Sequence, residues 1–283
     1  MIFSVISYTC VLMLTKINEA GTRKKLYNRI YSGFTGIDNN IHGWQSGDLI
    51  ILASCPSCGK TAFALSLLKY AAVNSQTKTV LFSIENPKDL IISRLRTAYG
   101  NICLDNIFID DTPGISLEEI SEKIRTLVVM HEVKLVIIDY FQLIDGRKQY
   151  WDIKDRNLAR EQELSAISKQ LKTMSQELDI AIIATFQMNP RLLRHRMRNN
   201  SSYEFGLNDL LDNGAIEREA DIVMFINRPD IFRPATDLDE QASPEVAILK
   251  NRGNKGARIK VNFDSTLSRF DDIATLHTSE IFA

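Results

Sequence analysis

The loop formed by residues 56–61 has the composition of a phosphate-binding loop, because it ends in the sequence Gly-Lys-Thr. An apolar run precedes it and a second apolar segment follows, so the loop is expected to join a buried strand to a helix. Backbone N–H groups at the start of such a helix bind phosphate groups. The pattern places Lys60 at the β- and γ-phosphates and the hydroxyl of Thr61 on Mg²⁺. The full motif begins with a glycine where this chain has Ser54.

Three further polar residues, Glu85, Asp139 and Gln187, each follow a predicted buried strand. A carboxylate in the position of Asp139 can hold Mg²⁺ and its water ligands beside a phosphate loop. Glu85 can orient or activate an attacking water molecule. The uncharged amide of Gln187 can donate a hydrogen bond to a γ-phosphate without repelling it. Because open α/β sheets bind ligands at the carboxyl ends of their strands, these side chains are expected to converge on one crevice.

The order of the predicted elements indicates how these residues are positioned. Strand and helix patterns alternate from about residue 29 onward. This order predicts an α/β fold, in which a doubly wound, mostly parallel sheet is flanked by helices and ends in a late antiparallel hairpin. The expected strands are 49–54, 80–84, 107–109, 135–138, 180–186, 222–226, 245–251 and 258–263. The expected helices are 60–73, 87–99, 116–130, 158–178 and 207–219.

Composition narrows the class of protein. The chain has 283 residues, of which 45% are hydrophobic and 24% are charged, as expected of one large α/β domain or two small ones. Its formal net charge of −1 excludes a polycation, so any contact with nucleic acid has to come from local basic patches. The four cysteines lack the spacing of a disulfide framework, which favours a reducing compartment, either the cytoplasm or an organelle interior.

Two short segments have more than one interpretation. Residues 2–14 are apolar but too short to span a bilayer, and they lack the basic region and cleavage site of a signal peptide. They are expected to dock on another subunit, unless the chain starts at Met13. Cys55 and Cys58 form a Cys-x-x-Cys pattern, which in isolation suggests a redox pair or half of a zinc site. Because the pattern continues directly into Gly-Lys-Thr, the nucleotide loop is the favoured interpretation and a regulatory disulfide is the alternative.

Taken together, the motifs of this chain resemble those of the hexameric replicative DNA helicases of the DnaB type, in the same order and over about residues 30–272. The matching segments are 47–62, 82–85, 109–114, 137–144, 214–221 and 250–252. The resemblance implies a RecA-like P-loop ATPase domain at 29–275, with a linker or docking segment at 1–28 and a tail at 276–283. Too few residues precede the motor for the family's helical N-terminal domain, and residues 10–27 suffice only for a linker helix.

The resemblance also implies roles for individual residues. Glu85 matches the catalytic glutamate, Asp139 the magnesium aspartate and Gln187 the phosphate sensor. Lys250 and Arg252 match a basic pair that reaches the γ-phosphate bound by the neighbouring subunit, where a guanidinium can neutralise charge in the transition state. The residues that match the remaining contacts to nucleotide and metal are Ser57, Gly59, Lys60, Thr61, Ala62 and Arg94.

The segment that faces DNA in the family's ring pore is altered here, because Leu211 stands where an arginine is usual. Other departures from the family's pattern are Cys55, Phe186 and Pro190. Four arginines in the loop after Gln187 could bind phosphates in place of the missing ones, or they form a basic surface loop. The expected DNA-binding residues are Arg191, Arg194, Arg196, Arg198, Asp212, Asn213 and Gly214.

These features predict a motor that hydrolyses ATP with Mg²⁺, assembles as a ring of six subunits and moves along single-stranded DNA. The resemblance alone implies the 5′ to 3′ direction. A primase or a loader is a further expected partner, and no membrane contact is expected. The alternative is a nucleotide-switched loading or assembly factor that binds DNA or a helicase without unwinding. Leu211 favours that alternative, whereas Glu85 and the pair formed by Lys250 and Arg252 favour the motor.

Overall fold

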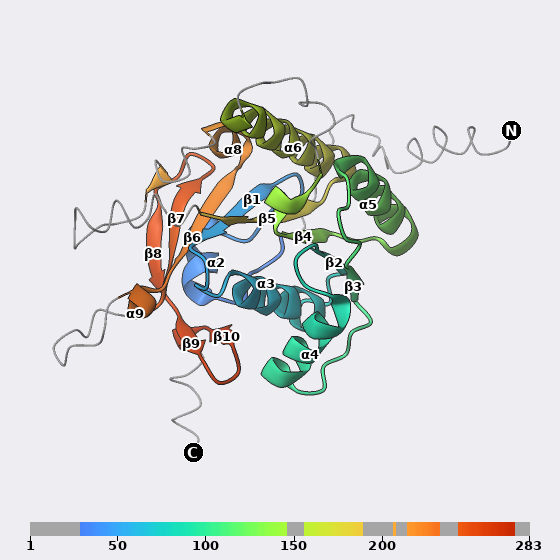
Figure 1. The fold of residues 1–283 in the computed structure, drawn as a ribbon. Helices are drawn as coiled ribbons and strands as arrows, with labels where there is room; N and C mark the ends of the chain where they lie inside the picture. Colours follow the sequence, from blue (N-terminus) through green and yellow to red (C-terminus); the bar gives the residue numbers. More distant parts are fainter. Residues whose placement is uncertain (1–28, 146–155, 189–205, 208–213, 233–242, 275–283) are drawn as a thin grey trace, which may run out of the picture.

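The structure of the chain, a computed structural model, describes residues 29–145, 156–188, 206–207, 214–232 and 243–274. At its centre lies an eight-stranded sheet with the strand order β3-β2-β4-β5-β1-β6-β7-β8 (Figure 1). The strands from β3 to β6 in this order run parallel, and β7 and β8 join in antiparallel orientation. The strands are β1 (Leu49–Ser54), β2 (Thr79–Ser83), β3 (Ile107–Asp110), β4 (Leu135–Asp139), β5 (Ala181–Gln187), β6 (Ile222–Asn227), β7 (Glu245–Asn251), β8 (Ala257–Lys260), β9 (Asn262–Asp264) and β10 (Arg269–Asp271).

Helices cover both faces of this sheet (Figure 1). Helices α2, α3 and α4 pack on one face through a buried cluster that includes Phe63 and Ile91. Helices α5, α6 and α8 pack on the other face through a cluster that includes Ile120 and Ile167. The helices are α2 (Thr35–Ile41), α3 (Lys60–Lys69) with the π-helical turn η2 (Tyr70–Asn74), α4 (Lys88–Tyr99), α5 (Leu117–His131), η3 (Phe141–Leu143), α6 (Arg156–Leu178), α8 (Gly214–Glu219) and α9 (Pro229–Phe232).

The predicted fold class is confirmed, including the late antiparallel hairpin, which is formed by β7 and β8. The apolar strands are buried on both faces, as parallel strands between two helical layers must be. Helix α5 begins where a helix was expected, after Ser116, which forms a capping box with Glu119. The Ser116 hydroxyl accepts from the Glu119 N–H, and the Glu119 carboxylate accepts from the Ser116 N–H.

Three elements differ from the sequence-based expectation. The predicted strand 258–263 is two strands, because β8 pairs with β7 whereas β9 pairs with β10 in a separate two-stranded sheet. The predicted helix 60–73 changes to a π-helical turn at Tyr70. Helix α2 was not predicted, since its sequence is poor in helix formers. It forms because Ile37 and Ile41 are buried in the core, and such tertiary contacts override propensity.

A tight turn after β7 places a charged residue at the amino edge of the parallel strands. The Asn254 N–H donates to the Asn251 carbonyl oxygen at 2.6 Å, so the turn proper consists of Arg252 and Gly253. Both have positive φ, 46° and 86°, as in a type I′ hairpin turn. Because Asn251 pairs with Ile222, the first residue of β6, this turn lies at the opposite sheet edge from the phosphate loop.

Candidate functional site

The phosphate-binding loop connects β1 to α3 at the carboxyl edge of the parallel strands. Gly59 is the N-cap residue of α3 and has a φ of 86°. A Cβ atom at this position would lie 2.9 Å from the ring of Phe270, so a larger residue would have to displace that ring. Gly59 also has no side chain with which to cap the helix. The first-turn N–H groups of α3 are therefore left for an anion.

Asp139, the last residue of β4, is 1% exposed and accepts hydrogen bonds at both carboxylate oxygens. The Thr61 hydroxyl donates to Oδ2 at 2.6 Å, and the Thr185 hydroxyl donates to Oδ1 at 2.6 Å. The structure thus brings together the two residues that the sequence predicts at the metal. Thr185 was not predicted, although a hydroxyl within a buried apolar strand is a detectable signal, because buried polar groups need a partner.

Lys60 lies beside Asp139 with its ammonium group poorly satisfied. Its side chain is 7% exposed, and Nζ lies 3.4 Å from Asp139 Oδ1. Nζ also lies 3.8 Å from the centroid of the Tyr140 ring, and it makes no well-aligned hydrogen bond to any described residue. Burial lowers the pKa of Lys60, and the charges of Asp139 and Glu85 oppose that shift. A buried ammonium with unused donors is expected where an anionic ligand binds.

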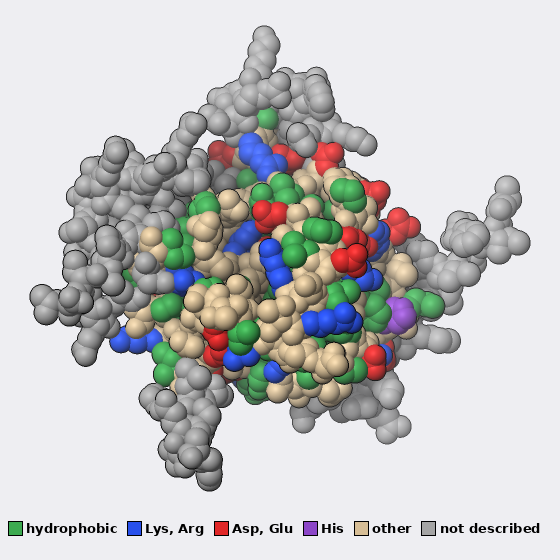
Figure 2. All heavy atoms as spheres, turned by 60° about the horizontal axis from the view of Figure 1, so that its bottom comes forward, with side chains coloured by type: hydrophobic (Ala, Val, Ile, Leu, Met, Phe, Trp, Pro, Cys, Tyr) green, Lys and Arg blue, Asp and Glu red, His purple; other side chains and the backbone are tan. Residues whose placement is uncertain are grey.

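A pocket of about 450 Å³ opens beside the phosphate loop. Three of the predicted residues reach it from outside the loop: Glu85 follows β2, Arg94 comes from α4, and Gln187 ends β5. The predicted residues that line it are Ser57, Gly59, Lys60, Thr61, Ala62, Glu85, Arg94 and Gln187. Figure 2 views the molecule from the side of α3, α4 and the β9–β10 hairpin, where Lys and Arg side chains are interspersed with acidic ones.

The residues of this pocket, together with Asp139, which contacts Thr61 and Lys60 but does not line the pocket, fit a nucleoside triphosphate with Mg²⁺. The Lys60 ammonium and the first-turn N–H groups of α3 offer donors for phosphate oxygens. The Thr61 hydroxyl and the Asp139 carboxylate offer the oxygen ligands that Mg²⁺ prefers. The volume of the pocket lies within the range of small-molecule sites, about 300–1,000 Å³. The chemistry predicted from the sequence is therefore possible in this geometry.

The backbone position of Gln187 is fixed by a residue that the sequence did not single out. Gln142 Nε2 donates to the Gln187 carbonyl oxygen at 2.7 Å, and the Gln187 N–H donates to Gln142 Oε1 at 2.9 Å. The backbone pairing of β4 with β5 ends before this point, so the side chain of Gln142 extends it toward the pocket. Arg160, on α6, donates in turn to the Gln142 carbonyl oxygen. The loop after β4 and the end of β5 are thereby tied together.

One wall of the pocket comes from the β9–β10 hairpin, which the sequence did not predict either. Phe270 packs edge-on against Phe63 of α3, with ring centroids 5.3 Å apart. The Ser66 hydroxyl donates to the Phe270 carbonyl oxygen at 3.2 Å. These contacts hold the hairpin residues Phe263 and Leu267 at the pocket. They join segments far apart in the chain, so no local pattern could have signalled them.

Lys250 and Arg252 do not line this pocket, because they lie at the amino edge of the sheet. Lys250 Nζ donates to the Glu217 carbonyl oxygen at 2.7 Å, near the end of α8. Strand β1 has 6 residues, and a strand rises about 3.3 Å per residue, so the two sheet edges lie roughly 17 Å apart. Neither side chain can therefore reach the phosphate loop of its own chain.

The predicted DNA-contact residues fall almost entirely outside the described part of the chain. Only Gly214 is described, as the first residue of α8. The predicted helix 207–219 is described as a helix from Gly214 to Glu219. The residues outside the described ranges are Arg191, Arg194, Arg196, Arg198, Leu211, Asp212 and Asn213.

Cys55 and Cys58 are buried and form no disulfide in the described part of the chain. A hydrogen bond with Cys58 and burial raise the pKa of Cys55, which favours the thiol over the reactive thiolate. Within the described ranges, no group of 3 or more His, Cys, Asp or Glu side chains could hold a metal ion, so the zinc interpretation gains no support.

No helix in the described ranges is long and apolar enough to cross a membrane.

Comparison with known proteins decides the family. The family model of the DnaB-like helicase C-terminal domain matches residues 29–106 and 92–272. This chain belongs to that family. The predicted resemblance is thereby confirmed, and the match extends over the whole sheet and both helical layers.

Similar proteins and structures agree with this assignment. The replicative DNA helicase DnaC of Bacillus subtilis (strain 168) is 31% identical over 95% of this chain and 62% of its own length. The replicative DNA helicase DnaB of Geobacillus stearothermophilus is 31% identical over 85% of this chain and 56% of its own length. The chain therefore spans about three fifths of these relatives. A solved structure described as an ATPase domain matches with a TM-score of 0.74 and 27% identity, covering 86% of this chain and 91% of that one.

Proposed function

We propose that this chain is the ATP-hydrolysing motor of a replicative-type DNA helicase. The observation that carries the proposal is the pocket in which the unsatisfied ammonium of Lys60 meets Glu85 and Gln187 beside the phosphate loop. Membership of the family supports it, because similar proteins are named replicative DNA helicases. The chain spans only part of those relatives, so its substrates and partners are also proposals.

In this proposal the phosphates of ATP bind at the first turn of α3 and at Lys60. Glu85 accepts a proton from the water molecule that attacks the γ-phosphorus, and the bond between that phosphorus and the oxygen of the ADP leaving group breaks. Gln187 donates its amide hydrogen bond to the γ-phosphate, so it distinguishes ATP from ADP. Mg²⁺ at Thr61 and Asp139 would supply neutralisation of the phosphate charge.

Lys250 and Arg252 are proposed to act on a nucleotide bound by a neighbouring subunit. Their place at the amino edge, roughly 17 Å from their own phosphate loop, supports action in trans. A site at one edge of a subunit and its complement at the opposite edge suit a head-to-tail interface that closes into a ring. We expect six subunits, as the family implies, and hydrolysis that depends on assembly.

The proposed track is single-stranded DNA, followed in the 5′ to 3′ direction at the replication fork. This role places the protein with the nucleoid in the cytoplasm, or in the equivalent space of an organelle. A primase or a loader is a proposed partner. One similar structure, a DnaB-like replicative helicase, is described together with its interactions with primase; its TM-score is 0.74 and its identity 26%, over 86% of this chain and 62% of that one.

Paired assays of ATP hydrolysis and fork unwinding test the proposal. We expect single-stranded DNA to stimulate hydrolysis, and forks with a 5′ tail to be unwound. Lys60→Ala removes the ammonium group from the pocket and is expected to abolish both activities and to weaken nucleotide binding. Lys78→Ala is the matched control, because the Lys78 side chain is 41% exposed and does not line the pocket.

Two results would count against parts of the proposal. Near-normal hydrolysis by Lys60→Ala would refute the assignment of the pocket. Hydrolysis that DNA stimulates without any unwinding would favour a nucleotide-switched loading factor over a motor.

A further inference from the structure

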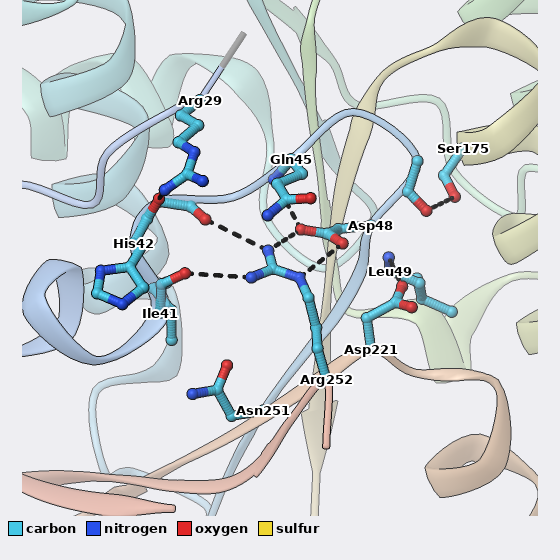
Figure 3. A network of polar contacts seen from close by, with 12 residues as sticks. Arg29, Ile41, His42, Gln45, Asp48, Leu49, Ser175, Asp221, Asn251 and Arg252 are labelled. Atoms are coloured by element: carbon cyan, nitrogen blue, oxygen red, sulfur yellow. Dashed lines mark hydrogen bonds and ion pairs between the residues drawn. The ribbon is translucent and has the colours of Figure 1, made fainter. Parts of the chain in front are cut away.

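The side chain of Arg252 is held by its own chain along both edges of the guanidinium (Figure 3). Nε donates to Asp48 Oδ1 at 3.0 Å, and Nη2 contacts Asp48 Oδ2. Nη1 donates to the Ile41 carbonyl oxygen at 3.1 Å, and Nη2 donates to the Gly43 carbonyl oxygen at 3.3 Å. The guanidinium therefore lies between a carboxylate and two backbone carbonyls.

These contacts occupy the atoms that would bind a phosphate. A guanidinium binds carboxylate or phosphate with two parallel N–H groups from one edge of its fork. Asp48 occupies the edge formed by Nε and Nη2. The carbonyls of Ile41 and Gly43 occupy the edge formed by Nη1 and Nη2. An arginine already poised for a neighbour's nucleotide would keep one of these edges open.

Asp48 is firmly placed, whereas the arginine side chain keeps access to the outside. Asp48 precedes β1 directly, and its Oδ2 also accepts from the Gln45 N–H at 2.7 Å. The Asp48 side chain is 8% exposed and that of Arg252 is 19% exposed. The Arg252 N–H donates to the Asp221 carbonyl oxygen at 2.9 Å, which anchors the backbone. Any exchange of partners therefore involves the side chain of Arg252 alone.

We propose that Asp48 is the positioning residue of Arg252. Asp48 holds the guanidinium against its own subunit, and the phosphate of a nucleotide in the neighbouring subunit has to displace Asp48 from the guanidinium. The inference rests on the proposed action of Arg252 in trans. Carboxylate and phosphate compete for the guanidinium, because each offers two oxygens to the same fork. The neighbour's phosphate is within reach only after assembly, so Asp48 keeps Arg252 disengaged until a loaded interface forms.

Removal of the Asp48 charge is expected to affect the rate of hydrolysis differently under the proposal and under a purely structural role. If Asp48 competes with phosphate, removal of its charge makes Arg252 engage more readily and speeds hydrolysis at the interface. If Asp48 only supports the fold, the same change leaves hydrolysis unaltered or slows it.

Subunit mixing isolates this step. Lys60→Ala subunits keep Arg252 but lack a working pocket, and Arg252→Ala subunits keep the pocket but lack the arginine. In a mixture, an intact pocket meets an intact arginine only where a Lys60→Ala subunit donates Arg252 to its neighbour. Single-turnover hydrolysis is then compared between this donor and a donor that also carries Asp48→Asn. Asparagine keeps the size of the side chain and an acceptor for the Gln45 N–H.

We expect the Asp48→Asn donor to raise the single-turnover rate about fivefold, the factor by which a modest, partly exposed ion pair biases an equilibrium. Asp48→Glu in the same donor keeps the negative charge and is expected to give the rate of the unmodified donor. If the asparagine donor melts below the assay temperature, Asp48→Ser, whose hydroxyl can still accept from Gln45, takes its place.

Subunit mixing tests the trans role of Arg252 and the role of Asp48 separately. If the mixture with the unmodified donor shows no recovery of hydrolysis, the trans role of Arg252 is refuted, and the inference about Asp48 falls with it. If hydrolysis recovers but the asparagine donor is no faster than the unmodified donor, the role of Asp48 is overturned while hydrolysis in trans stands.

Discussion

The two edges of the sheet differ in how well their buried charges are hydrogen-bonded. At the carboxyl edge, the ammonium of Lys60 is buried 3.4 Å from Asp139 Oδ1, without a well-aligned hydrogen bond to the described residues. At the amino edge, charges are matched: Arg252 binds Asp48, and Lys172 Nζ donates to Asp221 Oδ2 at 2.6 Å. A buried charge that lacks hydrogen bonds costs the folded state more free energy than a buried charge in a hydrogen-bonded ion pair. The carboxyl edge, where we propose that nucleotide binds, is therefore expected to be less stabilised by its buried charge than the amino edge, and it offers a donor that has no hydrogen-bond partner in the described residues.

The largest expected effect concerns the chemistry at the carboxyl edge. Glu85→Gln keeps the shape of the side chain but cannot take the proton from water. We expect hydrolysis to fall by about 100-fold or more, while ATP binding, which depends on Lys60 and α3, is retained. Phosphate release and the binding of a fluorescent ATP analogue measure the two quantities. The control is Glu118→Gln, an exposed position on α5. Turnover within about threefold of the parent, well short of a usual general-base contribution, would rule out this role for Glu85.

A smaller effect is expected for Gln142, which positions the pocket residue Gln187. Gln142→Ala removes both hydrogen bonds that hold the backbone of Gln187. We expect kcat to fall by about 10- to 100-fold, because a small misplacement of a reacting group has a cost of this size. The KM for ATP should stay near that of the parent, since Lys60 is untouched. Gln162→Ala, at an exposed position of α6, is the control. A rise in KM with kcat unchanged would contradict the positioning role.

Stability without nucleotide compares the two edges directly. Arg252→Met leaves the buried Asp48 without its partner and should lower the free energy of unfolding by about 2 kcal/mol. Lys60→Met removes a buried ammonium that pairs with Asp139 at 3.4 Å without a well-aligned hydrogen bond. Because Asp139 keeps its hydrogen bonds from the Thr61 and Thr185 hydroxyls, this change should alter the free energy of unfolding by less than about 1 kcal/mol, or raise it. Urea unfolding followed by circular dichroism measures both. Arg125→Met, which breaks an exposed ion pair with Glu177, sets the scale of a surface contact. Equal losses of unfolding free energy in Lys60→Met and Arg252→Met would contradict the difference between the two edges.

The smallest expected effect is a dependence of stability on pH that Lys60 causes. Below its lowered pKa, Lys60 is protonated in both states, and burial of the charge disfavours the folded state. As the pH rises through that pKa toward the ordinary lysine value of 10.5, the folded state releases the proton first, so stability rises. The difference in unfolding free energy between the parent and Lys60→Met, followed into this alkaline range, isolates the contribution. A difference that does not change with pH would show that burial does not control this lysine.

The carboxyl edge was largely predictable, because its signals are local. Each of Glu85, Asp139 and Gln187 ends or follows an apolar run, and parallel strands bring such ends to one edge. The phosphate loop is likewise a contiguous stretch with an apolar strand before it and a helix after it. A sequence pattern can therefore locate these residues even though it cannot give the distances between them.

The amino edge was not predictable, because its contacts join distant parts of the chain. Asp48 and Arg252 stand 204 positions apart, and nothing near either residue signals the other. The late hairpin that carries Arg252 was expected, but its turn lacks the usual Asn-Gly or Asp-Gly pair, so the sequence did not indicate the type I′ conformation. The same reason explains why the β9–β10 hairpin was missed, since its place at the pocket depends on Ser66 and Phe63 of α3.

The position of β1 in the sheet has a consequence for the synthesis of the chain. This strand is apolar up to its last residue, Ser54, and lies between β5 and β6. Its first neighbour, β5, begins only at Ala181, so β1 leaves the ribosome long before either partner exists. At typical rates of translation the delay is on the order of ten seconds. During that time an apolar, unpaired strand has to be covered by its own helix α3 or by a chaperone. The central strand of the sheet therefore pairs only late in synthesis.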